Sequence, residues 1–160
     1  GELAYEAMNK RDYPSFGHWI DQGATTTWEQ WNGENSRNHP MFGGSLTWFY
    51  RKLAGLNADP SQPGYRHIVF RPQPVSQIDA TATPYGQASV DWSKRGGRFT
   101  MTVEVPVGCT ATVCVPDAKA PSAVRTDGTG KKDGNIVYNG MKDDYAEYTV
   151  RSGKYTFTVE

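Results

Sequence analysis

The chain has 160 residues, with 17 lysines and arginines against 17 aspartates and glutamates, so its formal net charge is zero and its pI is near 7.0. This balance argues against a nucleic-acid binder and against a protein held at a membrane by basic residues. The mean hydropathy is −0.67, and no apolar run approaches the roughly 18 residues that a membrane-spanning helix needs. The contents of Gly, Pro and aromatic residues are typical of a chain that folds. The length fits one large domain or two small ones.

A first helix is predicted over residues 2–10, where Leu3, Ala7 and Met8 share one side and charged residues the other. Position 1 is Gly rather than Met, so we expect the chain to begin inside a larger protein. No signal peptide is visible, which leaves the compartment open if the true N-terminus lies elsewhere. A periplasmic or secreted location is favoured over a cytoplasmic one.

A long loop-like stretch follows, rich in Gly and Pro, with one helical turn predicted at residues 26–31. A second helix is predicted over residues 44–56, because apolar residues recur there at spacings of three and four and Gly55 lies where a helix commonly ends. From Pro60 onward the period changes to two. The sequence thus predicts a helical region over residues 1–57 and a strand region over residues 58–160.

Strands are predicted at about seven places in the second region, namely residues 67–71, 88–92, 98–105, 110–115, 135–138, 148–150 and 155–159. Residues 95–97 would turn one hairpin, and Ser152-Gly153 would turn a second between the last two strands. Short alternating strands at this spacing predict an antiparallel β-sandwich.

Cysteines and histidines give no sign of a metal or a cofactor. Cys109 and Cys114 are five residues apart, so their side chains lie on opposite faces of an extended strand, and two buried free thiols are expected. Neither a C-x-x-C nor an H-x-x-x-H spacing occurs, and a structural role is favoured over metal binding for the three histidines. We therefore predict no metal site and no cofactor.

Residues 23–43 combine aromatic rings with a dense set of polar side chains. Glu29 lies between Trp28 and Trp31, and the polar residues that follow are Asn32, Glu34, Asn35, Arg37, Asn38 and His39. A sugar stacks its C–H faces on aromatic rings while its hydroxyl groups take the polar contacts. This stretch predicts a carbohydrate ligand.

Each of these residues also has a structural interpretation. Thr26 and Glu29 match a capping box, and the spacing alone favours that role for Glu29 over catalysis. Trp28 and Trp31 are three apart, so on a helix they would share one face of a core. His39 precedes Pro40 and must be extended, which favours a loop histidine bonded to a backbone carbonyl.

Three blocks carry a resemblance to a known family: GATTTWEQWNG at residues 23–33, SRNHPMFGGSLTWFYRKLAGL at residues 36–56 and PGYRHIVFRPQP at residues 63–74. In order and spacing they resemble the end of the catalytic domain of bacterial α-L-rhamnosidases, glycoside hydrolase family 78. The tail YGQASVDWSKRGGRFTMTVEVPVGCTATVCVP is similar to the β-sandwich that follows the catalytic domain in this family. The resemblance covers nearly the whole chain.

The resemblance implies the last helices of an (α/α)6 barrel followed by a β-sandwich, and inverting hydrolysis of terminal α-L-rhamnosyl groups. It places Glu29 on the family's general base and His39 on a histidine that contacts the sugar, with Trp28 and Trp31 as further substrate-binding candidates. Pro40 departs from many family members and restricts His39. Inversion also needs a second, protonated carboxylate, and the family's acid comes from a segment that residues 1–22 do not resemble. We expect this chain alone to be inactive.

Two further expectations concern partners. The missing remainder of the same protein, or self-association, would cover apolar residues exposed on the helices, namely Leu3, Met8, Trp19, Phe42, Trp48 and Phe49. The alternative to an enzyme fragment is a non-catalytic carbohydrate-binding or scaffold module. Its sandwich would carry a solvent-facing strip drawn from Tyr85, Trp92, Tyr138 and Tyr145, although core packing is favoured for Trp92.

Overall fold

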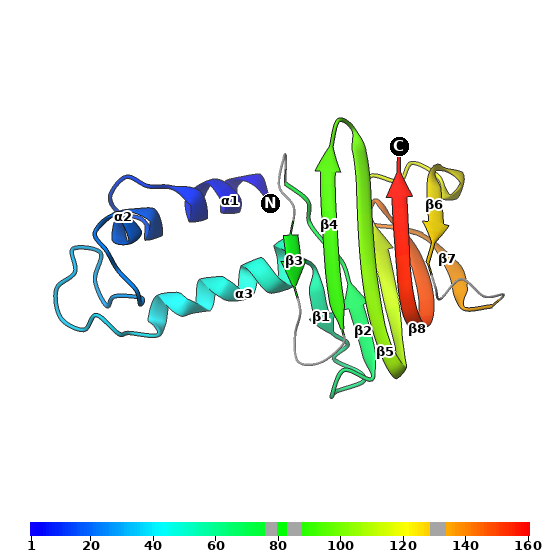
Figure 1. The fold of residues 1–160 in the computed structure, drawn as a ribbon, viewed down its shortest axis with the longest axis horizontal. Coiled ribbons are helices and arrows are strands. Elements are labelled where there is room, and N and C mark those ends of the chain that lie inside the picture. Colours follow the sequence, from blue (N-terminus) through cyan, green and yellow to red (C-terminus); the bar gives the residue numbers. More distant parts are fainter. Residues whose placement is uncertain (76–79, 83–87, 129–133) are drawn as a thin grey trace. The chain divides into compact units, whose positions relative to one another are not determined.

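The computed structural model describes residues 1–75, 80–82, 88–128 and 134–160, and the chain forms two compact units, residues 1–49 and residues 50–160. Helices and loops make up most of the first unit, and strands most of the second (Figure 1). None of the described helices is long and apolar enough to cross a bilayer. The domain division expected after residue 57 stays a prediction, since a compact unit need not coincide with a domain.

The first unit begins with two helices. α1 (Glu2–Asn9) confirms the first predicted helix to within one residue, and none of its residues is buried. α2 (Phe16–Asp21) was not predicted; its N-cap is Ser15, whose Oγ accepts the backbone N–H of His18 at 3.0 Å. The helical turn expected at residues 26–31 is wrong, because no residue of that segment is helical.

The second predicted helix is present but shifted toward the N-terminus. It consists of three consecutive pieces: the 3-10 helix η1 (Met41–Ser45), α3 (Leu46–Trp48) and the π-helix η2 (Phe49–Leu53). Gly55 follows with φ +84°, and a Cβ atom there would lie 2.2 Å from the nitrogen of Pro72. Glycine is therefore required where the helix gives way to the first strand.

Eight strands occur in the part of the chain that the structure describes. They are β1 (Leu56–Ala58), β2 (His67–Phe70), β3 (Ala80–Ala82), β4 (Ser89–Arg95), β5 (Arg98–Val115), β6 (Val124–Asp127), β7 (Ile136–Lys142) and β8 (Tyr145–Val159), with the short 3-10 helix η3 (Pro121–Ala123) before β6. β1, β3 and β6 were not predicted. The hairpin expected at residues 95–97 is confirmed as the turn between β4 and β5.

The hairpin expected at Ser152-Gly153 is wrong. β8 runs through this point as one strand and pairs antiparallel with β5, from Phe99 opposite Val159 to Val115 opposite Ala146. The pairing is interrupted only between Val105 and Thr110. The two halves of β8 therefore have β5, and not each other, as their partner.

The long strands β5 and β8 belong to two groups of strands. The first half of β5 and the second half of β8 pair with β4 and β6, and the other halves pair with β2 and β7. β3 and β1 complete the two groups at β4 and β2. β2 and β5 are parallel, so the prediction of a purely antiparallel arrangement is wrong, whereas the β-rich second unit is confirmed.

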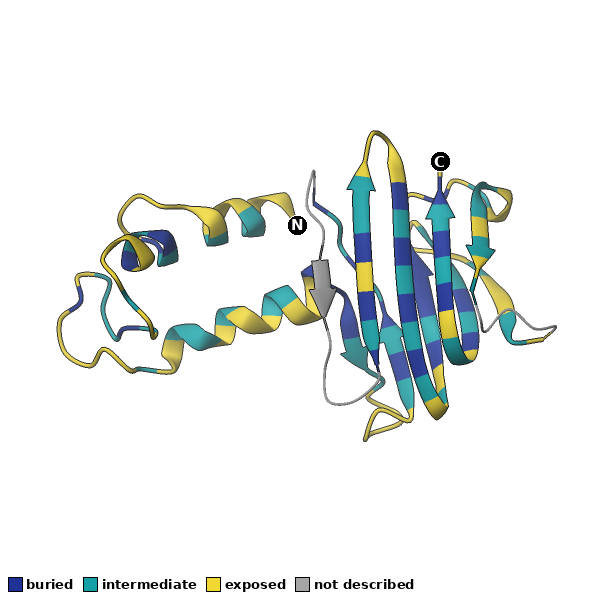
Figure 2. Ribbon diagram, in the orientation of Figure 1, coloured by how far each residue is buried: buried dark blue, intermediate teal, exposed yellow. Residues whose placement is uncertain are grey.

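Burial alternates along the strands and defines the core, as the banding in Figure 2 shows. The largest fully buried side chains are Trp92, Tyr155, Phe70, Phe99 and Phe157. Trp92 has no exposed surface, and its Nε1–H donates to the Leu53 carbonyl at 3.0 Å, which joins the helix end to β4. The expectation that Trp92 is a core residue is confirmed.

A polar cluster lies beside this core at the end of β2. The guanidinium of Arg71 lies 4.4 Å from the centre of the Tyr145 ring and donates to Asp143 at 3.2 Å. Cys114 on β5 is 1% exposed, with its Sγ 3.7 Å from a carboxylate oxygen of Glu147. Burial and the charge of Glu147 raise the pKa of Cys114 to about 12. Both cysteines are free as expected, although Cys109 is only half-buried.

This pKa predicts a loss of stability in alkaline solution. Below pH 9 the Cys114 thiol is neutral in both states, but between about 9 and about 12 only the unfolded chain releases its proton. The free energy of unfolding should therefore fall more steeply with pH in this range for the unmodified chain than for Cys114→Ala, measured by urea denaturation. Cys109→Ala should keep the steep dependence, and equal slopes for all three proteins would contradict the assignment.

Candidate active site

Five aromatic rings form a cluster in the first unit: Phe16, Trp19, Trp28, Trp31 and Phe42. Trp19 is 2% exposed, its ring centre lies 4.4 Å from that of Trp31, and its Nε1–H donates to the Trp31 carbonyl at 3.0 Å. The expectation of an exposed Trp19 is therefore wrong. Packing of this kind gives a short irregular segment a fixed position on α2.

The segment that carries Glu29 and His39 folds back on itself. The N–H of Glu29 donates to the Ser36 carbonyl at 2.8 Å, and the N–H of His39 donates to the Thr27 carbonyl at 2.8 Å. Residues 27–29 and 36–39 are thus two paired limbs, closed by the loop of residues 30–35. Glu29 and His39, ten positions apart in sequence, lie on neighbouring limbs as a result.

The side chain of Glu29 is half-buried and held at one oxygen. Its Oε2 accepts the backbone N–H of Ser36 at 3.1 Å, while Oε1 has no hydrogen-bond partner among the described residues. Thr26 is engaged elsewhere, because its hydroxyl donates to the carbonyl of Arg37. The capping-box interpretation of Thr26 and Glu29 is therefore wrong. A carboxylate with one fixed and one free oxygen is equipped to accept a proton.

The imidazole of His39 is oriented by the backbone. Its Nδ1 lies 3.3 Å from the N–H of Met41 and accepts that hydrogen bond. The expected bond from His39 to a backbone carbonyl is thus replaced by one from a backbone N–H. A neutral imidazole that accepts at Nδ1 carries its proton on Nε2, so His39 presents a donor there.

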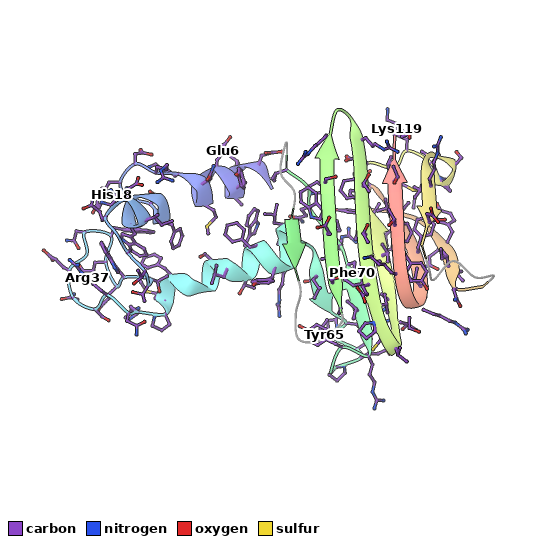
Figure 3. All side chains as sticks on the ribbon, in the orientation of Figure 1. Glu6, His18, Arg37, Tyr65, Phe70 and Lys119 are labelled. Atoms are coloured by element: carbon purple, nitrogen blue, oxygen red, sulfur yellow. The ribbon has the colours of Figure 1, made fainter. Side chains whose placement is uncertain are left out.

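Trp28 is enclosed on several sides. It is 6% exposed, the guanidinium of Arg37 lies 4.8 Å from its ring centre, and Gly33 packs against its edge. Figure 3 labels Arg37 on this loop. Through these contacts Trp28 supports the paired limbs from a buried position. Trp31, in contrast, is only half-buried. Substrate contact by either tryptophan stays a prediction.

Two residues of the site were missed from the sequence, Ser36 and Arg37. Ser36 binds Glu29 through its main chain, which no side-chain pattern reveals. Arg37 had been counted only among the polar residues of the loop. Its place above Trp28 depends on Gly33, which adopts φ +77° and whose Cβ, if present, would lie 2.8 Å from the Trp28 ring. The Asn32-Gly33 pair was the available signal for this turn.

Two family models match consecutive parts of the chain. The bacterial alpha-L-rhamnosidase 6 hairpin glycosidase domain matches residues 1–53, and the bacterial alpha-L-rhamnosidase C-terminal domain matches residues 55–130. An alpha-L-rhamnosidase of Streptomyces avermitilis is 32% identical over 173 residues, which cover 99% of this chain and 16% of that protein. One from Formosa agariphila is 33% identical over 134 residues, which cover 77% of this chain and 14% of that protein.

Solved structures of alpha-L-rhamnosidases also match this chain. The crystal structure of the Streptomyces avermitilis alpha-L-rhamnosidase complexed with L-rhamnose matches 99% of this chain with a TM-score of 0.81 and 34% identity. The solved structure of an alpha-L-rhamnosidase from Dictyoglumus thermophilum matches 99% of this chain with a TM-score of 0.77 and 35% identity. The chain belongs to the bacterial α-L-rhamnosidase family. It spans only 16% and 19% of these two relatives.

Other carboxylates in the first unit of this chain are engaged in ion pairs or lie on the surface. Asp12 lies 3.3 Å from the amine of Lys10, and Asp21 at the end of α2 is paired with Arg11. Glu6 is exposed on α1 (Figure 3). No group of three or more His, Cys, Asp or Glu residues in the described ranges is placed to hold a metal ion.

The alternative of a carbohydrate-binding sandwich required a strip of exposed aromatic rings. Trp92 is fully buried, and the hydroxyl of the half-buried Tyr145 donates to the Pro72 carbonyl at 2.9 Å. Tyr138 is 39% exposed, but its ring leans on Tyr148. Tyr85 lies outside the described residues. The described residues thus give a binding strip no support beyond Tyr138.

The packing at Gly33 predicts a measurable effect on the site. Gly33→Ala should destabilise the first unit by roughly 1–3 kcal/mol, because it adds a clash with Trp28 to the strain of a positive φ. Gly23→Ala is the matched control, since Gly23 has φ +79° with nothing within 4 Å of the added Cβ. Tryptophan fluorescence during urea unfolding reports the cluster. Equal loss in both variants would contradict the role of the Gly33–Trp28 contact.

Proposed function

We propose that the chain is the C-terminal part of an inverting glycoside hydrolase that releases terminal α-L-rhamnose from glycosides. In this proposal residues 1–57 supply the last helices of an (α/α)6 catalytic barrel, and residues 58–160 form a C-terminal β-sandwich domain. The match of residues 1–53 to a 6 hairpin glycosidase domain supports the barrel. The L-rhamnose complex of the Streptomyces avermitilis relative supports the sugar.

Glu29 is the general base of this proposal, and the observation that carries it is the unequal environment of its two oxygens. The Ser36 N–H fixes Oε2, while Oε1 is left to accept a proton from water. The paired limbs hold the carboxylate without help from a helix. A base positioned in this way directs one water at the anomeric carbon, and in an inverting reaction that water becomes the new hydroxyl.

His39, on one limb, and Trp31, in the loop between the limbs, would contact the sugar. Trp28 would hold the limbs in place and is a further candidate for substrate contact. The proposed donor on Nε2 of His39 can bond a sugar hydroxyl, because Nδ1 is occupied by the Met41 N–H. Trp31 keeps part of its ring exposed while Trp19 and Phe42 fix it. An apolar ring and a directed donor together suit a deoxyhexose, which has both apolar and hydroxylated faces.

The general acid is expected outside this chain. An inverting pair of carboxyl groups is about 6.5 to 9.5 Å apart, with the acid on the opposite side of the sugar from the base. Asp12 and Asp21 are held in ion pairs, and Glu6 is solvated on α1, so none of the three is suited to protonating a leaving group.

Replacing Glu29 tests the base directly. In the complete parent polypeptide, Glu29→Gln should lower kcat on an aryl α-L-rhamnoside by about 10² or more, because the amide cannot accept the proton of water. Glu34→Gln is the matched control: Glu34 is exposed in the same loop, and its variant should keep near-normal kcat. Near-normal turnover by a folded Glu29→Gln variant would remove Glu29 from the chemistry.

The 160-residue chain should by itself show no α-L-rhamnosidase activity. The reason is the missing acid: a base alone cannot assist departure of the aglycone. The measurement is release of the aryl group from an aryl α-L-rhamnoside by the purified chain, with the parent polypeptide as the positive control. Turnover by the chain that Glu29→Gln abolishes would show that it holds a complete site.

A further inference from the structure

A cleft of about 540 Å³ lies wholly within the second unit, where the end of η2 meets β1 and β2. Among the residues that the structure describes, its charged lining consists of three cations, Arg51, Lys52 and Arg71, without a carboxylate. This cleft has no part in the chemistry assigned to Glu29. Its volume is within the range of about 300–1,000 Å³ that small-molecule sites occupy.

The backbone beneath the two helical cations is firmly held. The Asn57 amide donates to the carbonyls of Arg51 and Gly55 at 3.0 and 3.1 Å, and the N–H of Gln73 donates to the Lys52 carbonyl at 2.9 Å. The carbonyls that a helix end leaves without partners are therefore bound by the strand region. Arg51 and Lys52 project from a fixed platform.

The charges of the cleft are unequally compensated. Arg51 and Lys52 are exposed, and neither forms an ion pair with any residue that the structure describes. Arg71 is paired with Asp143 at 3.2 Å and with Glu147 at 3.9 Å and stacks on Tyr145, so its planar group is fixed at the cleft wall and its charge is already compensated. The two free cations favour an anion, and the planar guanidinium of Arg51 matches a carboxylate.

The remaining lining distinguishes a sugar acid from a bare inorganic ion. Ala58, Pro60 and Val69 supply apolar surface, and the side chains of Asn57 and Gln73 add polar atoms. Because both amide hydrogens of Asn57 are already bonded to carbonyls, its oxygen remains as an acceptor for a hydroxyl group. An apolar patch, a hydroxyl acceptor and cations together suit a pyranose that carries a carboxylate.

We infer that this cleft binds a uronate residue of a glycan. The choice of a glycan over another organic anion rests on the proposed function, while the charge of the ligand rests on the cleft alone. The competing explanation is that Arg51 and Lys52 only complement the negative end of the helix, as basic residues in a last turn do. That explanation predicts a role in stability and no ligand.

The experiment titrates the 160-residue chain with trigalacturonate, followed by calorimetry and by amide chemical shifts. Methyl-esterified trigalacturonate is the neutral counterpart, and inorganic phosphate is the free anion. Arg51→Gln/Lys52→Gln removes the two free cations, and Arg151→Gln/Lys154→Gln removes two exposed cations on β8 for the same change in net charge. The shifts of residues 69–73 locate the site in the unmodified chain even if a variant fails to fold.

We expect trigalacturonate to bind and to shift residues 69–73, and Arg51→Gln/Lys52→Gln to weaken it by roughly tenfold or more. The methyl ester should bind the unmodified chain about tenfold more weakly than trigalacturonate does. Arg151→Gln/Lys154→Gln should bind trigalacturonate as tightly as the unmodified chain. Absence of binding, equal losses in both double variants, or phosphate binding as tightly as trigalacturonate would overturn the inference. Because no hydrolysis is measured, failure here leaves the role of Glu29 untouched, and Arg51→Gln/Lys52→Gln in the parent should still hydrolyse a neutral aryl rhamnoside.

Discussion

The second unit depends on the antiparallel pairing of β5 with β8. These are the longest strands, and their register carries each of them through both groups of strands with one interruption near Val105. The other strands attach to one half or the other, so the position of each is set by this pair. Because side chains alternate along a strand, this register alone places Phe99 and Phe157 in the core. A shift of one residue in the register of β5 against β8 would exchange the buried and exposed side chains of the shifted strand.

The first unit is stabilised in a different way, because its central segment has no regular secondary structure. Two limbs of a loop are paired through the main chain, and a cluster of aromatic rings fixes them on α2. The conformational entropy lost in ordering such a segment is offset by the burial of the apolar side chains of Trp19 and Trp28. A regular helix or strand would have engaged the backbone N–H of Ser36 in its own hydrogen bonds. In the loop it is free to hold Glu29.

The sequence predicted what depends on local patterns. The period of two gave the strands β4, β5 and part of β8, and the Gly-Gly pair gave the β4–β5 turn, because these signals act between near neighbours. What it missed depends on distant partners: β1 and β6 are short and gain their pairing only from β2 and β8. Ser152-Gly153 has the composition of a turn, but β5 pairs with β8 on both sides of this point, where the register shifts.

The candidate site divides in the same way. Residue types alone brought attention to Glu29, His39 and the tryptophans, and the family resemblance assigned them roles. Neither could show that Thr26 bonds to Arg37 and leaves Glu29 to Ser36, since both contacts close a loop over a separation that no helix or hairpin rule covers. The capping-box spacing was therefore a coincidence of composition.

The most direct measurement of the central claim is chemical rescue of Glu29→Ala in the complete parent polypeptide. Azide is a nucleophile that needs no base, so it should restore cleavage of an aryl α-L-rhamnoside and yield a rhamnosyl azide of inverted configuration. That result would identify Glu29 as the group that activates water. A folded variant that turns over normally without azide, or that azide leaves inactive, would contradict the account.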